Sequence, residues 1–132
     1  IARFDDIEQM NYKDYIGPSK EQIKDIVMWD NLSEDQTILV HCTAGKSRST
    51  AVSLGILIRF GYSLSDALEE VIKIRTNEGN SLIVPNRLII KHLDEIFDLG
   101  GELIKLIDDY YETLEKTVPL QLLRIGRHTI ED

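Results

Sequence analysis

The sequence predicts an α/β fold, because one buried strand and several amphipathic helices follow one another in a chain of single-domain length. The chain has 132 residues, 42% of them hydrophobic, which is enough for one compact core. Thr37-Ile38-Leu39-Val40 is a short apolar run with β-branched residues, typical of a buried strand. We therefore expect a single domain over residues 1–132, in which helices pack around this strand.

One helix is expected before this strand and another after it. Ser19 is a predicted N-cap after the turn at Gly17-Pro18, and the helix that follows ends near Asn31. The second helix begins near Ser47 and ends at Phe60-Gly61-Tyr62, where the glycine suits a C-terminal cap.

Three further helices are expected in the second half of the chain. Ser65 is a predicted N-cap, and its helix runs to about Thr76. Pro85 favours the first turn of the next helix, which Gly100-Gly101 ends. Residues 102–116 carry apolar side chains at helical spacing and predict an amphipathic C-terminal helix.

The charge is unevenly distributed along the chain. A formal net charge of −8 argues against a general nucleic-acid binder. Residues 36–62, however, hold Lys46, Arg48 and Arg59 and no acidic residue, which favours a small anionic ligand there. Charged residues interrupt every apolar stretch within a few positions, so no membrane span is expected. The single cysteine excludes an internal disulfide.

The stretch after the predicted strand combines a nucleophile with an anion site. A helix that begins after a short loop offers free N–H groups and the positive end of its dipole to an anion. Five residues separate Cys42 from Arg48, enough for the loop to curl around a tetrahedral anion while the guanidinium holds two oxygens. Gly45 supplies backbone freedom in this loop. The same donors would stabilise a thiolate on Cys42 and make it a nucleophile.

The pattern His-Cys-x5-Arg-Ser at residues 41–49 resembles the signature loop of the cysteine-based protein tyrosine phosphatases, in particular their compact dual-specificity-like branch. Arg75 and Pro85-Asn86 also fall where that branch often has these residue types. The resemblance covers residues 3–97, with 101–132 as a helical extension, and implies a mostly parallel central sheet. In the family several strands precede the catalytic aspartate, whereas only about four residues do here, so the usual N-terminal strands are expected to be missing.

The resemblance implies a two-step phosphoryl transfer without a cofactor or metal. Cys42 would form a cysteinyl-phosphate, while Arg48 and the loop backbone hold the equatorial oxygens. Ser49 would help to break this intermediate, and His41 would orient the loop. The implied substrate-binding residues are Thr43, Ala44, Gly45, Lys46, Ser47, Arg48 and Asn86.

The family mechanism also needs an aspartate that protonates the leaving oxygen and then activates water. Asp6 is our first choice, because it follows a strand-like start and precedes a loop; it lies 36 residues before Cys42. Asp5 and Asp14 are the second and third choices.

Other interpretations remain open for some of these residues. Cys42 taken alone also fits a buried core residue, and His41 fits a structural histidine. A nucleotide-binding P-loop is excluded, because that motif needs glycine where Val40 stands. His92 and His128 lack ligand-like neighbours, so no metal site is expected.

The sequence therefore predicts a phosphatase whose substrate is a phosphorylated protein or a small phosphomonoester. One alternative is a phosphoinositide or inositol-phosphate phosphatase, because Ala44-Gly45-Lys46 with Arg48 resembles the loop of the lipid phosphatases. Thr43 argues against it, since those enzymes tend to carry a lysine there. The other alternative is a phosphate-binding module without catalysis. A reactive thiolate also predicts a reducing compartment, the cytoplasm.

Overall fold

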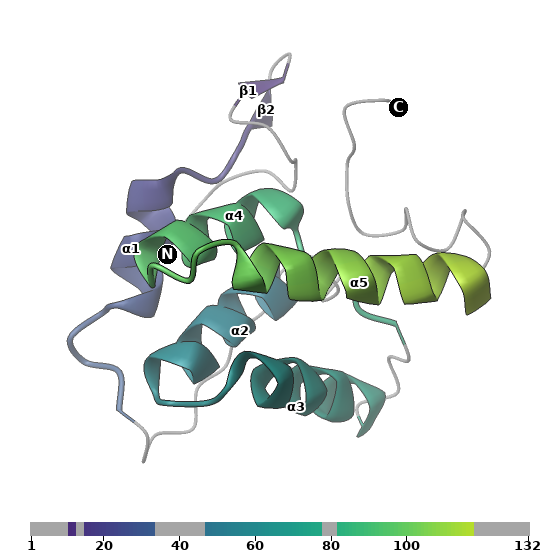
Figure 1. The fold of residues 1–132 in the computed structure, drawn as a ribbon. Helices are drawn as coiled ribbons and strands as arrows, with labels where there is room; N and C mark the ends of the chain where they lie inside the picture. The colour runs from purple at the N-terminus through teal and green to yellow at the C-terminus, as the bar shows by residue number, and fades with distance from the viewer. Residues whose placement is uncertain (1–10, 13–14, 34–46, 78–81, 118–132) are drawn as a thin grey trace.

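The computed structural model describes residues 11–12, 15–33, 47–77 and 82–117. In these ranges the chain forms two short strands and five helices (Figure 1). The strands β1 and β2 pair antiparallel, with Tyr12 opposite Tyr15. In chain order, the elements are β1 (Asn11–Tyr12), β2 (Tyr15–Ile16), α1 (Lys20–Val27), α2 (Arg48–Arg59), α3 (Leu64–Asn77), α4 (Arg87–Ile96) and α5 (Glu102–Thr117).

The predicted α/β fold class with a mostly parallel central sheet is wrong. The described part of the chain is helical, and its sheet structure consists of the antiparallel pair β1–β2. The physical reason is that the apolar faces of the helices cover one another, so the core needs no sheet beneath them. Ile23, Leu54 and Leu93, from three different helices, are all fully buried in this common core. The predicted strand Thr37–Val40 lies outside the described residues.

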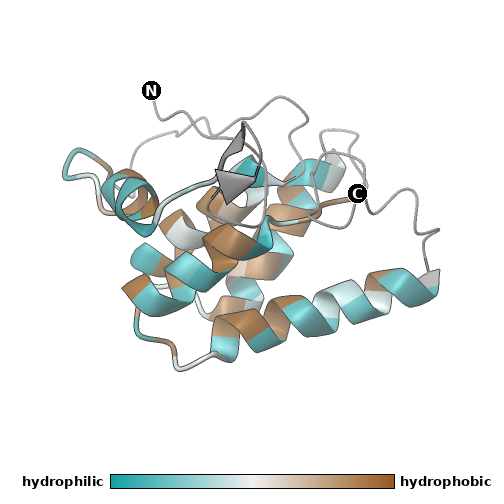
Figure 2. Ribbon diagram, turned by 90° about the horizontal axis from the view of Figure 1, so that it is seen from above, coloured by the Kyte–Doolittle hydropathy of each residue, from teal (hydrophilic) through white to brown (hydrophobic). Residues whose placement is uncertain are grey.

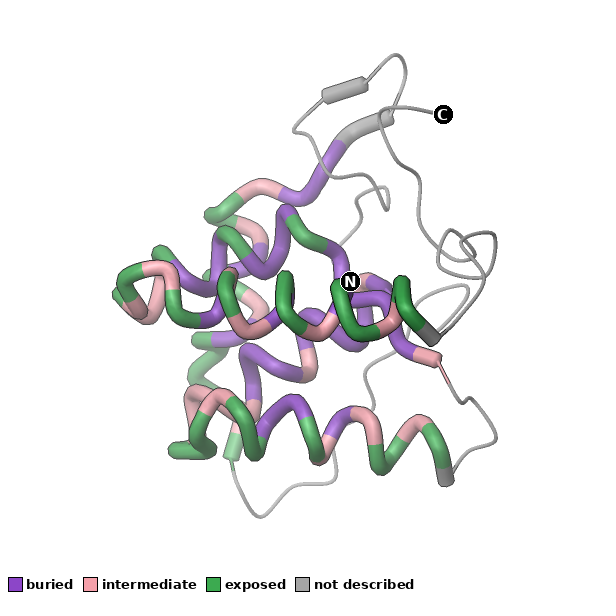
Figure 3. The backbone as a smooth tube through the Cα atoms, turned by 45° about the vertical axis from the view of Figure 1, so that its right-hand side comes forward, coloured by how far each residue is buried: buried purple, intermediate pink, exposed green. Residues whose placement is uncertain are grey.

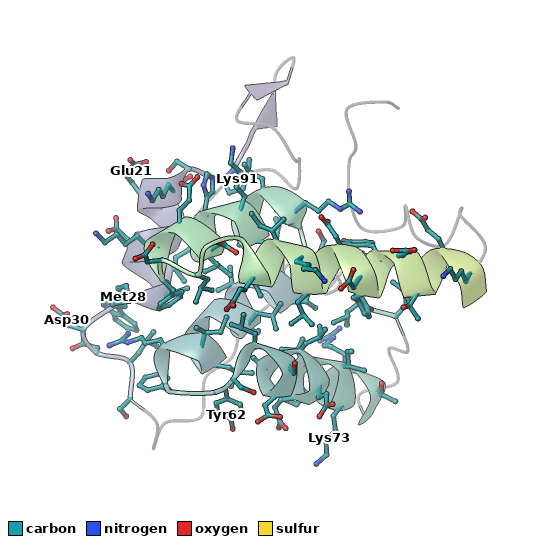
Figure 4. The ribbon with its side chains drawn as sticks, in the orientation of Figure 1. Glu21, Met28, Asp30, Tyr62, Lys73 and Lys91 are labelled. Carbon is teal, nitrogen blue, oxygen red and sulfur yellow. The ribbon has the colours of Figure 1, made fainter. Side chains whose placement is uncertain are left out.

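The core lies between α2 and α4, with the other helices around them. α4 packs against α1, α2 and α5, while α3 packs against α2 and α5. Figure 3 shows that α2 and α4 are buried along most of their length, whereas α3 and α5 each expose one side. Hydrophobic and hydrophilic bands alternate along α5 (Figure 2), and charged side chains such as Glu21, Lys73 and Lys91 point outward (Figure 4). Among the described helices, none is both long and apolar enough to cross a membrane.

Gly55 lies where α2 meets α1 and α4. A Cβ atom at this position would stand 2.6 Å from Cδ2 of Leu93 and 2.8 Å from Cγ1 of Val27, closer than packed atoms approach. Glycine inside a helix costs about 1 kcal/mol of intrinsic propensity relative to alanine. The close packing of the three helices explains why the chain has glycine at this point of α2.

The ends of α1 are held by side chains. The predicted N-cap is confirmed, because Oγ of Ser19 accepts from the N–H of Gln22 at 3.1 Å and Oε1 of Gln22 accepts from the N–H of Ser19 at 3.0 Å. The helix ends at Val27, before the predicted end near Asn31. There Nη1 of Arg59 donates to the carbonyls of Val27 at 2.9 Å and Trp29 at 2.7 Å, so α2 holds the C-terminal end of α1.

The third helix begins earlier than predicted. Oγ of Ser63 accepts from the N–H of Asp66 at 3.2 Å, so Ser63 performs the role that the sequence suggested for Ser65. Ser65 lies inside α3, which runs from Leu64 to Asn77. Both serines precede the same apolar stripe, and therefore both fit the local pattern of an N-cap.

Asp94, near the end of α4, fixes the start of α5. Its carboxylate is 5% exposed and accepts from the N–H groups of Gly101 at 2.7 Å, Leu103 at 2.9 Å and Ile104 at 3.2 Å. The predicted break does lie between the two helices, where Gly100 and Gly101 have φ of +63° and +90°. The helix itself ends earlier than predicted, however, because α4 stops at Ile96. The Asp94 carboxylate satisfies N–H groups that α5 leaves unpaired and lies at the positive end of its dipole.

Replacing Asp94 is therefore expected to weaken the attachment of α5. Asp94→Ala removes the acceptor of three N–H groups, and we expect a loss of about 2 kcal/mol in the free energy of unfolding. Urea denaturation followed by circular dichroism measures this loss. Asp108→Ala, on an exposed position of α5, is the control and should change stability by less than about 0.5 kcal/mol. Equal losses in the two variants would show that the Asp94 bonds do not hold the helix.

Candidate functional site

The structure describes one end of the predicted site. Ser47, Arg48 and Ser49 lie at the start of α2, and Asn86 lies just before α4. The remaining predicted catalytic and binding residues lie outside the described residues, together with the alternative aspartates: Asp5, Asp6, Asp14, His41, Cys42, Thr43, Ala44, Gly45 and Lys46.

The carbonyl oxygen of Ser47 joins the described parts of the site. It accepts hydrogen bonds from the N–H of Ala51 at 3.2 Å, from Oγ1 of Thr50 at 2.9 Å and from the N–H of Asn86 at 3.2 Å. Ser47 and Asn86 are both fully buried. Segments far apart in the sequence, the start of α2 and the start of α4, are thus tied together at one atom.

The first turn of α2 is electropositive. It begins with the partly buried Arg48 and contains no acidic residue, and Ser49 next to Arg48 is buried. The N–H groups at the start of a helix carry partial positive charge, which adds to the charge of the guanidinium. This end of α2 therefore favours a negatively charged group, as the sequence predicts for an anion site.

Asn86 has a clear structural part in this arrangement. Its Oδ1 accepts from the N–H of Ile89 at 3.0 Å and caps α4, while its own N–H donates to Ser47. The N-cap is therefore Asn86, and the helix begins at Arg87; Pro85 precedes the cap instead of opening the helix as the sequence suggested. Asn86 thus connects α4 to the start of α2 through its backbone.

Two tyrosines of α5 support the segment before Asn86, and the sequence analysis assigned them no such part. Oη of Tyr111 donates to the carbonyl of Pro85 at 2.6 Å, and Oη of Tyr110 donates to the carbonyl of Ile83 at 2.6 Å. The guanidinium of Arg87 also lies 4.4 Å from the ring centre of Tyr111. The sequence predicts only that residues 102–116 form an amphipathic helix, because a helical pattern does not report what a phenol hydroxyl contacts.

The phenol of Tyr110, near this site, has a pKa above its ordinary value. Burial raises the pKa of Tyr110 to about 12. Within the described ranges, no three His, Cys, Asp or Glu side chains gather in a way that could hold a metal ion.

Comparison with known proteins relates the chain to phosphatases. Over 99 residues it is 27% identical to an Arabidopsis thaliana protein named phosphatidylinositol 3,4,5-trisphosphate 3-phosphatase and protein-tyrosine-phosphatase PTEN1, and the match covers 71% of this chain and 24% of that protein. Over 65 residues it is 42% identical to putative tyrosine phosphatase 123R of Invertebrate iridescent virus 6, covering 48% of this chain and 42% of the viral protein. No family model matches the chain, and no solved structure matches it significantly.

These matches agree with the general resemblance found in the sequence, since the names of both proteins include a tyrosine phosphatase. The chain spans about a quarter of the length of the plant protein and less than half of the length of the viral one.

The partly buried phenol of Tyr110 predicts a specific loss of stability at high pH. A tyrosine in the unfolded chain ionises near pH 10, whereas folded Tyr110 keeps its proton up to about pH 12. Its contribution is therefore complete below pH 10 and is lost as the pH rises to about 12. Urea denaturation over this range should show a steeper loss in the wild type than in Tyr110→Phe. Tyr62→Phe, at a 42% exposed position, should follow the wild type, and identical curves for all three proteins would contradict the assignment.

Proposed function

We propose that the chain is a cysteine-dependent phosphatase of the dual-specificity-like type, which hydrolyses phosphate monoesters on proteins, with phosphotyrosine as its main substrate. The observation that carries this proposal is the pattern His41-Cys42-x5-Arg48-Ser49, whose last two residues begin α2. The similarity to two proteins named as phosphatases also supports it.

The geometry at the start of α2 also supports the proposal. Arg48 and the N–H groups of the first turn lie at the same helix end, where both favour a bound anion. The Ser47 carbonyl, held by three donors, limits the movement of this end. Such preorganised donors stabilise charge in a transition state without having to rearrange during the reaction.

In the proposed mechanism the thiolate of Cys42 attacks phosphorus, so that an S–P bond forms while the ester P–O bond breaks. Asp6 donates its proton to the leaving oxygen. The Asp6 carboxylate then accepts a proton from water, which attacks phosphorus and breaks the S–P bond, releasing inorganic phosphate and regenerating the thiolate. Arg48 and the backbone of residues 43–48 hold the equatorial oxygens through both steps.

Two other side chains have supporting parts in the proposed reaction. The hydroxyl of Ser49 donates to the sulfur as the thiolate leaves, and His41 orients the loop. Because the nucleophile works only as a reduced thiolate, we also propose a reducing compartment, the cytoplasm, as the place of action.

Cys42→Ser tests the proposal directly. We expect the wild type to hydrolyse an activated aryl phosphate and a phosphotyrosine peptide, and the variant to lose at least about 10⁴-fold in kcat because the nucleophile is gone. The variant should still bind the phosphopeptide, measured by calorimetry, since Arg48 and the loop backbone remain. A wild type that binds phosphate but turns over neither substrate would instead establish a phosphate-binding module.

A phosphoinositide phosphatase is the second candidate function. Two observations favour it: the name of the plant protein includes this activity, and Ala44-Gly45-Lys46 offers an additional lysine for a second phosphate. Thr43 favours the first candidate. Soluble phosphatidylinositol 3,4,5-trisphosphate in the same assay decides between them, because a higher kcat/KM on the lipid than on the phosphopeptide would reverse our order.

Substrates with different leaving groups test which aspartate is the general acid. Asp6→Ala should lower kcat/KM by about 10²–10³-fold on a phosphotyrosine peptide, whose leaving oxygen needs a proton. On an aryl phosphate with a good leaving group, the loss should be less than about tenfold. Asp5→Ala and Asp14→Ala are the matched controls and should lack this difference between substrates. If one of them shows the difference and Asp6→Ala does not, that aspartate is the acid.

A further inference from the structure

We propose that Tyr111 of α5 is a positioning residue, which fixes the direction of the first N–H group of α2 through two consecutive peptide groups. The inference rests on the proposed function, in which this N–H group is part of the phosphate-binding loop. It concerns a residue of the C-terminal helix, outside the part of the chain that carries the family resemblance.

The first step is a contact between Tyr111 and a peptide group before α4. Oη of Tyr111 donates to the carbonyl of Pro85 at 2.6 Å, and the N–H of Asn86 donates to the carbonyl of Ser47 at 3.2 Å. The Pro85 carbonyl and the Asn86 N–H belong to the same planar peptide group. This group is therefore held at both ends, by α5 on one side and by the start of α2 on the other.

The second step uses the peptide group that follows. The Ser47 carbonyl and the N–H of Arg48 are again parts of one peptide group, and no described peptide bond is cis. In a trans peptide group the N–H points opposite to the carbonyl. The bond from Asn86 to Ser47 therefore sets the direction of the Arg48 N–H, which points away from α4.

The two steps form a continuous chain of hydrogen bonds. It runs from the Tyr111 hydroxyl through Pro85–Asn86 to Ser47–Arg48. In such a chain, a donor to a carbonyl polarises the peptide group and strengthens the bond made by its N–H. The hydroxyl of Tyr111 thus acts on both the direction and the donor strength of the Arg48 N–H.

Tyr111 is well suited to hold this position. Its side chain is 1% exposed, and the guanidinium of Arg87 lies 4.4 Å from its ring centre. Asp94 fixes the start of the same helix. Because water does not reach the phenol, the bond to Pro85 has no competing partner from solvent.

Tyr110 provides a matched comparison on the same helix. Its hydroxyl donates at the same distance, 2.6 Å, but to the carbonyl of Ile83. The Ile83 carbonyl shares its peptide group with the N–H of Val84. Among the described residues, no hydrogen bond joins this N–H to the Ser47 carbonyl. Tyr110 therefore supports the segment without directing the start of α2.

The test compares Tyr111→Phe with Tyr110→Phe, since each removes one hydroxyl. Cys42 is the single cysteine, so the pH dependence of alkylation by iodoacetamide measures its thiol alone. In Tyr111→Phe we expect this profile to move to higher pH, because the donors that stabilise the thiolate are less well aligned. We expect kcat/KM on an aryl phosphate to fall about tenfold, since deleting such a donor outright costs about 10²–10³-fold. Inhibition by inorganic phosphate should weaken as well.

In Tyr110→Phe the alkylation profile and kcat/KM should stay within about twofold of the wild type, although the protein loses stability. Thermal unfolding of each variant sets an assay temperature at which all are folded. A loss of stability alone does not move the thiol profile, so this readout separates positioning from general destabilisation.

The inference is overturned if Tyr111→Phe and Tyr110→Phe have the same pH dependence of alkylation, the same inhibition by phosphate and the same kcat/KM. If the wild type is active in that experiment, the proposed function still stands. If the wild type shows no turnover, and if its Cys42 is alkylated at the same pH as an ordinary cysteine, the proposed function itself fails. Should Tyr111→Phe not fold, Arg87→Lys keeps the positive charge but loses the planar contact with the ring. An unchanged thiol profile in that variant then overturns the inference.

Discussion

The hydrogen bonds to the Ser47 carbonyl are the interaction on which the candidate site depends. This oxygen accepts from Thr50 and Ala51 of its own helix and from Asn86 at the start of another. The local bonds determine where α2 begins, and the distant bond determines the direction in which it begins. Because the atoms are buried, water does not compete for them, and the arrangement is as rigid as the helices that supply the donors.

The other helices hold α2 along its whole length. At its far end Arg59 bonds the carbonyls that end α1, and in the middle Gly55 allows α1 and α4 to approach closely. At its start the support comes from α4 and, through Tyr111, from α5. The C-terminal helix carries none of the predicted catalytic residues, yet it supplies the Tyr111 hydroxyl that bonds Pro85, and Asp94 holds the start of the same helix.

Local signals in the sequence predicted the helices well, because caps and breaks depend on neighbouring residues. Ser19 caps its helix as predicted, and Gly100-Gly101 lies in the turn between two helices. The error at the third helix is a choice between two nearby serines, Ser63 and Ser65. The fold class failed for a different reason. One short apolar run predicts at most one strand and does not establish a whole sheet. The packing of helix on helix depends on contacts between distant residues, which no local pattern reports. The bonds from Asn86 to Ser47 and from Tyr111 to Pro85 are of this distant kind.

Residue types and spacing predict the roles of Arg48 and Ser49, and the described geometry adds how the helix that carries them is held. The distribution of charge explains why short-range contacts must carry the proposed phosphate binding. The chain has a net charge of −8, and the exposed side of α5 is rich in acidic residues, so the field of the whole protein repels an anion. In the proposed site, N–H donors and Arg48 would hold a phosphate group within hydrogen-bond distance, because screening and repulsion govern its approach but matter less once it is bound. The direction of those donors would then matter more for affinity than the total charge, and the Ser47 peptide group is the described part of the chain that sets this direction.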